Sequence, residues 1–163
     1  MTAPDRAARL IEELGLAPHP EGGWYRELHR STGTVAPADG RPSRPAITSI
    51  YYLLPAGSHS RWHRVASDEV WHFYEGDPLE LLVAPPDLAH VERVRLGPAL
   101  ATHGPVHTVP AGWWQAARPR GHYTLAGCTV GPGFDYADFA FLRDHPDGLA
   151  RLAALSGELA ALA

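Results

Sequence analysis

The stretch SRWHRVASDEVWHFYEG, residues 60–76, places two histidines and the adjacent acidic residues Asp68 and Glu69 around a turn between two apolar runs. With the glycine that precedes it, the stretch has a regular pattern, in which five, one, three and six residues separate Gly57, His63, Val65, Glu69 and Gly76. Alternate residues of a β-strand share one face. His63 therefore shares a face with Val65, and the run after the turn presents a second such set: Glu69, Trp71 and Phe73.

A second stretch, GPVHTVPAGWWQ at residues 104–115, has a related spacing. Five, one and two residues separate Gly104, Pro110, Gly112 and Gln115. Trp113 and Gln115 lie two positions apart and therefore share a strand face. Each stretch thus combines polar side chains with tryptophan.

Short apolar runs separated by turn signals continue along the chain. The run AITSIYYLLPAG, residues 46–57, is rich in β-branched and aromatic residues and ends at a proline and a glycine, which predicts a buried strand. Turn signals such as EGDP, APPD and RPRG separate the later runs. Further strands are predicted at 61–65, 69–75, 79–84, 91–96, 106–109, 113–117 and 122–130. This spacing favours an antiparallel sandwich or barrel.

Helical patterns flank the β-rich core. Apolar residues recur at helical spacing in the first segment, about 4–15, where Gly15 is a stop signal. Leucines recur similarly at about 146–161. We predict a single domain over residues 1–163, with its core at about 19–140.

Composition excludes several classes of function. The formal net charge is −4 and no stretch is densely basic, which argues against nucleic-acid binding. Cys128 is the single cysteine, so an internal disulfide is excluded and a reducing cytoplasm is expected. No apolar run is long enough to span a membrane, and the N-terminus is too charged for a signal peptide. The chain has no lysine, which rules out Schiff-base chemistry by its own residues.

The two spaced stretches resemble the two motifs of the cupin superfamily. The first cupin motif has a second histidine where this chain has Val65, and the second motif has a histidine where this chain has Gln115. The family's terminal asparagine falls at Pro119. The spacing is kept while residues that bind metal in the superfamily are replaced.

Four longer blocks look like the cupin family known as DUF985 or Cupin_5. They are HPEGGWYRELHRS (19–31), TSIYYLL (48–54), WHRVASDEVWHFYEGDPLEL (62–81) and GCTVGPGFDYADF (127–139). The resemblance implies an all-β jelly-roll barrel with short helices at both termini, usually a homodimer, similar to epimerases of the RmlC type. It also implies a pocket in which His63, Glu69 and Gln115 converge among the aromatic side chains of Trp71, Phe73 and Trp113.

The candidate metal ligands are few. Zinc and non-haem iron sites generally use at least three protein ligands with imidazole, thiolate or carboxylate donors. Only His63, Glu69 and the amide of Gln115 are available, because valine cannot coordinate. We therefore expect no bound metal, and a divalent metal on these three residues is the alternative.

Without a metal, His63 and Glu69 form a candidate proton-transfer pair, because a carboxylate raises the pKa of a nearby imidazole and burial opposes that effect. Either Tyr52 or Tyr51 would be the opposing acid, since only one of the two neighbours faces inward. Arg26 is a candidate clamp for an anionic substrate group. The alternative for Arg26 is a surface arginine paired with Glu27.

Other chemical residues are interpreted as structural. His72 has the opposite parity to Glu69 and is expected to point away from the pocket. Cys128 lies in an apolar strand without a neighbouring base in the sequence and is assigned to the core. Asp135 and Asp138 are interpreted as turn and capping residues.

The sequence therefore predicts a small-molecule-binding cupin, with an isomerase or epimerase acting on a sugar or other carbonyl compound as the leading hypothesis. His63, Glu69 and Tyr52 are its expected catalytic residues, and Gln115 orients the substrate. A metal-dependent oxygenase or isomerase and a non-catalytic ligand-binding protein are the alternatives, because one fold hosts many chemistries.

Overall fold

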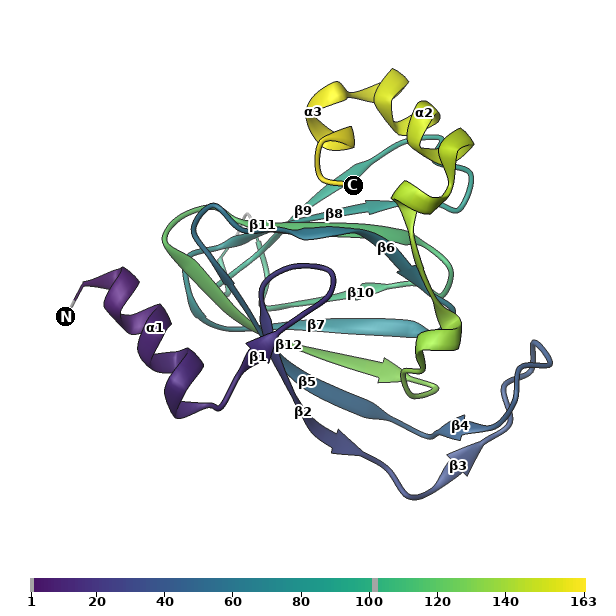
Figure 1. Ribbon diagram of the computed structural model, residues 1–163, viewed down its shortest axis with the longest axis horizontal. Coiled ribbons are helices and arrows are strands. Elements are labelled where there is room, and N and C mark those ends of the chain that lie inside the picture. Colours follow the sequence, from purple (N-terminus) through teal and green to yellow (C-terminus); the bar gives the residue numbers. More distant parts are fainter. Residues whose placement is uncertain (1, 101–102) are drawn as a thin grey trace.

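Two antiparallel sheets face each other with the core between them (Figure 1). The computed structural model describes residues 2–100 and 103–163. The first sheet has the order β1 (Ala17–Pro18), β2 (Trp24–Arg30), β5 (Thr48–Pro55), β12 (Tyr123–Gly131), β7 (Asp68–Gly76) and β10 (Val106–Val109). The second has the order β13 (Phe139–Phe141), β6 (Ser60–Val65), β11 (Trp114–Pro119), β8 (Leu79–Ala84) and β9 (Glu92–Leu96).

Strands that are distant in sequence pair with each other, as in a jelly roll. β12 lies between β5 and β7, and β11 lies between β6 and β8. Within the described residues the two sheets remain separate ladders, so the architecture is a jelly-roll sandwich. A short arm, β3 (Thr34–Val35) paired with β4 (Arg44–Pro45), extends beyond the ends of β2 and β5 (Figure 1). The all-β fold class predicted from the sequence is confirmed.

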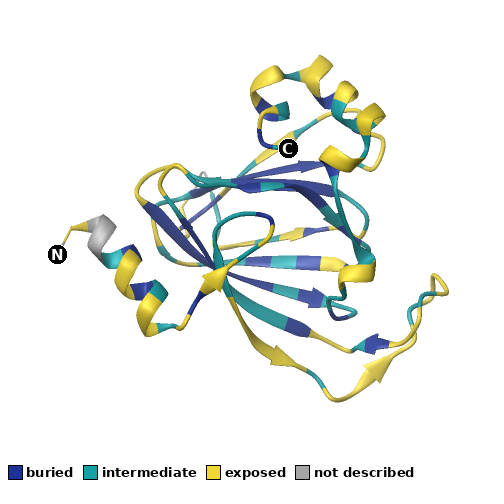
Figure 2. Cartoon of the chain, viewed as in Figure 1, coloured by how far each residue is buried: buried dark blue, intermediate teal, exposed yellow. Residues whose placement is uncertain are grey.

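The main core fills the space between the sheets. Strand alternation produces it, since Leu79, Leu81 and Val83 of β8 face the first sheet, whereas Leu82 and Ala84 face the opposite way. Tyr52 and Trp71 are the largest contributions from the first sheet, and both are almost fully buried. Figure 2 shows the buried strands gathered in the centre and the exposed segments at the arm and the terminal helices.

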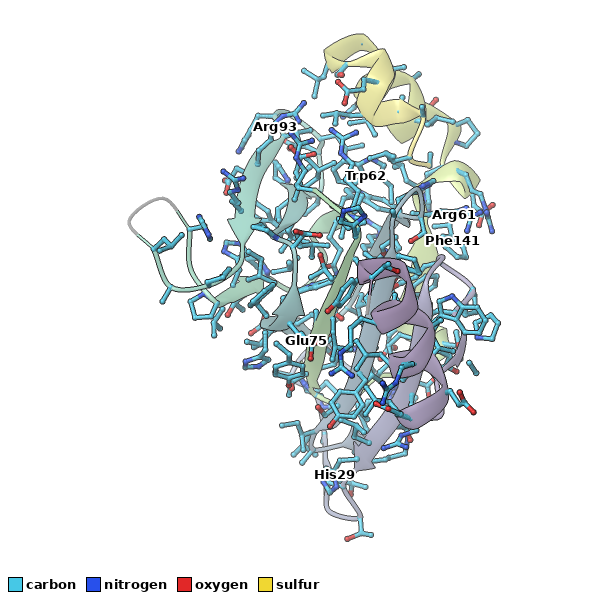
Figure 3. The ribbon with its side chains drawn as sticks, turned by 90° about the vertical axis from the view of Figure 1, so that its left-hand side faces the viewer. His29, Arg61, Trp62, Glu75, Arg93 and Phe141 are labelled. Carbon is cyan, nitrogen blue, oxygen red and sulfur yellow. The ribbon has the colours of Figure 1, made fainter. Side chains whose placement is uncertain are left out.

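The helices cover the outer faces of the two sheets. α1 (Ala3–Glu13) packs Leu10 against Leu53 and Leu125 of the first sheet. α2 (Pro146–Leu155) and α3 (Gly157–Ala160) cover the second sheet, where the Trp62 indole N–H donates to the Leu159 carbonyl at 2.9 Å (Figure 3). The C-terminal helix predicted as one segment is two helices, because Ser156 ends α2 and caps α3.

The later strands predicted from the sequence form with small shifts at their ends, whereas β1 to β4 and β13 were not among the predicted strands. In the block HPEGGWYRELHRS, the structure has a turn at the glycines and β2 after it. Two 3₁₀ turns, η1 (Tyr136–Asp138) and η2 (Leu142–Asp144), flank β13. In the described parts of the chain, no helix is long and apolar enough to cross a membrane.

Candidate functional site

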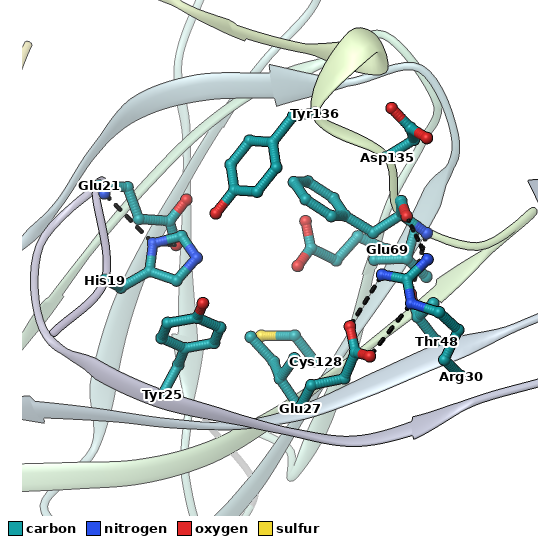
Figure 4. A pocket seen from close by; sticks show the side chains of 13 residues that line it. His19, Glu21, Tyr25, Glu27, Arg30, Thr48, Glu69, Cys128, Asp135 and Tyr136 are labelled. Carbon is teal, nitrogen blue, oxygen red and sulfur yellow. Dashed lines mark hydrogen bonds and ion pairs between the residues drawn. The ribbon is translucent and has the colours of Figure 1, made fainter. Parts of the chain in front are cut away.

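A cavity of about 350 Å³ opens on the inner face of the first sheet, at the end where β2, β5 and β12 meet the segment before η1 (Figure 4). Four of its lining residues are carboxylic acids and three are aromatic rings other than histidine. The cavity is lined by His19, Glu21, Tyr25, Glu27, Arg30, Thr48, Ile50, Glu69, Cys128, Val130, Phe134, Asp135 and Tyr136. The carboxyl groups of Glu21 and Glu69 turn toward its centre (Figure 4).

The loop between β1 and β2 carries Glu21 into this cavity. Gly22 has φ +109°, and a Cβ on it would collide with the carbonyl oxygen of His59, so the loop approaches the start of β6 only with glycine there. The Arg61 N–H donates to the Glu21 carbonyl at 2.8 Å, and the Tyr52 hydroxyl donates to the Gly22 carbonyl at 2.7 Å. These bonds fix the loop against β5 and β6.

His63 meets Glu21 behind the cavity wall. Its Nε2 lies 3.2 Å from Glu21 Oε2, and its Nδ1 lies 2.7 Å from the Arg61 carbonyl oxygen. A carbonyl oxygen only accepts hydrogen bonds, so Nδ1 carries a proton and Nε2 faces the carboxyl group. One proton between Glu21 and His63 then satisfies both groups. The ring also stacks on Phe139, with centroids 5.3 Å apart.

Burial moves the pKa values of this pair toward the uncharged forms. It raises the pKa of Glu21 above its ordinary value, and it lowers the pKa of His63 against the opposing charge of Glu69. A neutral carboxylic acid that donates to a neutral imidazole fits both directions. The pair therefore holds a transferable proton at the cavity wall.

Glu69, on β7, is oriented by a chain of hydrogen bonds. The Gln115 amide nitrogen donates to Glu69 Oε2, and the Trp71 indole N–H donates to Gln115 Oε1 at 2.8 Å. Burial raises the pKa of Glu69, while the charge of His63 and the hydrogen bonds from Gln115 and Cys128 oppose that rise. All these groups are buried. Hydrogen bonds thus hold the Glu69 carboxyl group in one orientation, and its pKa is raised above the ordinary value.

His19 and Tyr52 complete the inner wall. His19 Nδ1 accepts from the backbone N–H of Glu21 at 3.2 Å, and burial lowers the pKa of His19, so its ring is neutral. The ring lies edge-on to Tyr25 at 4.5 Å and to Tyr52 at 5.7 Å. Burial also raises the pKa of Tyr52 well above its usual value, which keeps the phenol protonated.

The structure brings part of the expected site together. His63, Glu69 and Gln115 converge, as the resemblance to cupins implies, although of these three only Glu69 lines the cavity. Of the two candidate tyrosines, Tyr52 faces inward, whereas Tyr51 lies on the outer face beside Tyr74. Three further expected residues pack against or within the main core rather than lining the cavity: Trp71, Phe73 and Trp113.

Arg26 lies on the opposite face of β2 from the cavity. Its guanidinium sits 5.8 Å from the centre of the Tyr51 ring. Glu27, the alternative partner considered for it, is bound by Arg30 instead, at 3.1 and 2.8 Å. The strand alternation that brings Tyr25 and Glu27 to the cavity thus takes Arg26 away from it.

The residues interpreted as structural have varied positions. His72 stacks on Tyr74 on the outer face, as its parity predicts. Asp135 caps η1 by accepting from the Ala137 N–H at 2.8 Å. Asp138 does not cap; it is a buried ion-pair partner of two arginines. Cys128 is buried, but it lines the cavity beside Glu69, and burial raises the pKa of its thiol well above the usual value.

The arginine pair on Asp138 anchors the mouth of the cavity. Arg44 donates to both carboxylate oxygens at 2.9 Å, and Arg41 donates to one of them at 2.7 Å. The Asp138 side chain is 3% exposed, and the Arg44 hydrogen bonds lower its pKa despite desolvation. Because Asp138 ends η1, this clamp ties the arm at β4 to the segment that contributes Phe134 and Tyr136 to the cavity.

The sequence reasoning missed the contribution of β2. Tyr25 and Glu27 alternate toward the cavity, but a bulge shifts the register between Glu27 and His29. Arg30, opposite Thr48, therefore faces the cavity, and His29 lies at the outer end of the molecule (Figure 3). The alternation of aromatic and charged residues after the glycine pair could have predicted the strand. No sequence pattern predicts the position of the bulge.

The donor set does not fit a metal ion. Both amide atoms of Gln115 and both ring nitrogens of His63 are engaged by protein groups, and Val65 stands at a ligand position. Within residues 2–100 and 103–163, no group of three or more histidine, cysteine or acidic side chains is arranged to hold a metal.

Proteins of known structure share this fold over nearly the whole chain. A hypothetical protein from Leishmania major is 34% identical, with 96% of this chain and 95% of that chain covered and a TM-score of 0.81. A protein of solved structure from Shewanella oneidensis is 34% identical, with 92% and 96% covered and a TM-score of 0.77. Oxalate decarboxylase from Bacillus subtilis shares the fold at 14% identity, with 90% of this chain and 36% of that chain covered and a TM-score of 0.58.

No curated protein matches the sequence. The model of the family Cupin_5, described as cupin superfamily (DUF985), matches residues 8–142. This match spans both spaced motifs, the PEGG block and the GCTVGPGFDYADF block. The chain belongs to the DUF985 family of the cupin superfamily.

Proposed function

We propose that this protein is a metal-independent enzyme that transfers a proton at a carbon next to a carbonyl group in a small molecule bound in the cavity. Such a step is the centre of epimerisation and isomerisation. The observation that carries the proposal is the pair of buried carboxyl groups, Glu21 and Glu69, that turn into one cavity with different partners.

Glu69 acts as the base. It lines the cavity and is oriented by Gln115, a neutral amide, rather than by a cation. Burial raises its pKa, and a carboxylate with a raised pKa is a stronger base toward carbon acids near neutral pH. Gln115 and Trp71 are positioning residues that hold the carboxylate in one orientation.

Glu21 acts as the acid on the other side of the substrate. Its carboxyl group reaches the cavity, and the proton that it shares with His63 is available to a developing enolate oxygen or carbanion. His63 is a positioning residue: its Nε2 accepts the Glu21 proton in the resting state, and Glu21 regains a proton when the enolate collapses. Tyr52 keeps its hydroxyl on the Gly22 carbonyl and holds the loop.

A non-catalytic ligand-binding protein is the second candidate. The observation that favours it is the full engagement of His63 and Gln115, whose polar side-chain atoms all have protein partners. In that case the carboxyl groups recognise the ligand and no proton leaves carbon.

The test is proton exchange in D₂O. A panel of sugars and other small carbonyl compounds is incubated with the protein, and deuterium incorporation at carbon is followed by NMR. We expect incorporation into at least one compound, lowered by more than a hundredfold in Glu69→Gln, because general-base catalysis contributes about 10²–10⁴-fold. Glu92→Gln, the same change at an exposed site, is the matched control and should leave the rate unaltered.

Two outcomes discriminate the alternatives. Binding without exchange across the panel favours the ligand-binding candidate. Exchange that requires added metal, with protein purified without chelators, contradicts the metal-independent mechanism.

The homodimer implied by the resemblance is also a proposal. Sedimentation equilibrium tests it directly, since a single chain has a mass of 17.7 kDa. A species of that mass at working concentrations contradicts the dimer.

A further inference from the structure

The charge at the mouth of the cavity points to the kind of ligand that enters it. Three aromatic side chains, Tyr25, Phe134 and Tyr136, line the mouth. The rings of Phe134 and Tyr136 lie edge to face at 5.0 Å, and the Tyr136 hydroxyl turns inward (Figure 4). Burial and the neighbouring Tyr25 hydroxyl raise the pKa of Tyr136, which keeps the Tyr136 phenol neutral.

Acidic groups outnumber basic groups around this space. Arg30 is the one guanidinium among the lining residues, and its donors already bind Glu27 and the Phe134 carbonyl, at 2.8 to 3.1 Å. Asp135 lies at the same rim, and Glu69 lies deeper. Arg30 is offset by Glu27, and Glu21 and His63 share one proton. Among the described lining residues, Glu69 and Asp135 then form no ion pair, although Asp135 lies within electrostatic range of Arg30 and Arg44.

We propose that the ligand of this cavity carries a protonated amine, which sits among Tyr25, Phe134 and Tyr136 beside Asp135. The inward-turned Tyr136 oxygen and the Asp135 carboxylate can accept hydrogen bonds from an ammonium group, and the quadrupoles of the neighbouring rings also attract a cation. An anionic substrate would meet Glu69 and Asp135 without a free arginine. The inference that the ligand also carries a carbonyl group depends on the proposed function. The inference that it carries an amine depends only on the residues at the mouth of the cavity.

Three probes of similar size and shape test the charge. Choline is a cation, 3,3-dimethylbutan-1-ol is its uncharged analogue, and 3,3-dimethylbutanoate is the matching anion. Calorimetric titration of the full chain should give choline an affinity about tenfold above the neutral alcohol, as expected for a cation–π site worth about 1–2 kcal/mol. The anion should bind more weakly than either. Equal affinities, tighter binding of the anion, or no binding of choline overturns the proposal.

Asp135→Asn removes the rim charge and keeps the cap on η1, because asparagine caps helices as well as aspartate does. The advantage of choline over the neutral alcohol should fall several-fold in this variant. Asp144→Asn is the matched control, since Asp144 is exposed in η2 and outside the cavity. A choline advantage that is unchanged in Asp135→Asn overturns the assignment of the amine to this rim.

Cys128 supplies an independent readout. It is the single cysteine of the chain and lines the cavity. The cationic aminoethyl methanethiosulfonate should label it about tenfold faster than the anionic sulfonatoethyl analogue, after each rate is divided by the rate on the unfolded chain. Equal or faster labelling by the anion overturns the proposal.

The two proposals fail separately. If deuterium exchange is absent while the choline preference stands, the enzyme proposal falls and the cation site remains. If exchange is present while the anionic probe binds best, the amine is wrong and the proton-transfer proposal remains.

Discussion

The imidazole Nε2 of His63 lies 3.2 Å from a carboxyl oxygen of Glu21, and both side chains are almost completely buried. The two residues come from different parts of the fold, the β1–β2 loop and β6. Since His63 Nδ1 is held by the Arg61 carbonyl, the contact between Nε2 and Glu21 depends on one proton. Both the stability of the fold at this wall and the proposed proton transfer by Glu21 depend on this proton.

Replacing Glu21 separates these two roles. Glu21→Ala leaves Nε2 of His63 without a partner and opens a void, so we expect a loss of about 2–4 kcal/mol in the free energy of unfolding. Glu21→Gln can donate its amide N–H to Nε2 and should cost less than about 1 kcal/mol while abolishing exchange activity. Urea unfolding at neutral pH measures the loss in the free energy of unfolding for both variants. Equal losses in the two variants would contradict the hydrogen bond.

The buried acids and histidines act in opposite directions as pH changes. Burial lowers the pKa of His63 from 6.5, so its contribution to stability is present above pH 6.5 and is lost as the pH falls below that value. Burial raises the pKa of Glu69 from 4.5, so its contribution is present below pH 4.5 and is lost as the pH rises through the folded-state pKa. Between pH 4.5 and 6.5 the two effects partly cancel.

Glu69→Gln should therefore lose stability more steeply than the native protein on acidification from pH 6.5 to 4.5. The acid that opposes the histidine effect has been removed, and His63 has also lost the neighbouring charge that favours its protonation. Urea midpoints across this range measure the slope, with Glu92→Gln as the exposed control. Parallel pH profiles for the native protein and Glu69→Gln would contradict the assigned shifts.

The clamp on Asp138 should be a major source of stability. Asp138→Ala leaves the buried guanidinium of Arg44 without its carboxylate, and breaking such a buried pair costs about 3–5 kcal/mol. Asp138→Asn keeps part of the hydrogen bonding and should cost less. Because the pKa of Asp138 is lowered from 3.8, the clamp is fully formed above that pH and is lost as the carboxylate is protonated below it.

Thermal unfolding compared with Asp144→Ala, an exposed aspartate in the following turn, checks this prediction. A loss in Asp138→Ala no larger than in Asp144→Ala would show that the clamp contributes little. The weakened anchor should also lower the affinity of the cavity for choline, since Tyr136 belongs to η1.

Gly22 should not tolerate a side chain. At φ +109° and against the His59 carbonyl, Gly22→Ala must move the loop that carries Glu21, with an expected cost of about 1–3 kcal/mol and a large loss of exchange activity. Gly33→Ala is the control, because no atom lies within 4 Å of a Cβ placed there. Comparable effects in the two variants would contradict the steric argument.

Much of the fold was predictable because its determinants are local. Runs such as TSIYYLL alternate or are continuously apolar and end at proline or glycine, so each strand is specified within its own segment. Strand parity likewise separated His72 from Glu69, which requires only the period of a strand. The convergence of His63, Glu69 and Gln115 was implied by the resemblance to cupins, in which these strand faces point into the barrel.

The partner of His63 was not predictable in this way. Glu21 reaches it because two glycines let a loop from another part of the chain pack on the start of β6, and no local pattern encodes that approach. Cys128 shows the same limitation. Nothing near it in sequence is a base, yet β12 and β7 pair so that Glu69 lies beside it.

The bulge in β2 has a consequence for how the charge of the cavity is encoded. Leu28 is the unpaired residue, and it is exposed, so its side chain contributes little to the core. Because Leu28 is left unpaired, Arg30 faces inward: with regular pairing through Leu28, His29 would lie opposite Thr48 in place of Arg30. Deleting Leu28 would keep Arg30 opposite Thr48. The balance of charge in this cavity is thus a property of strand register as much as of residue identity.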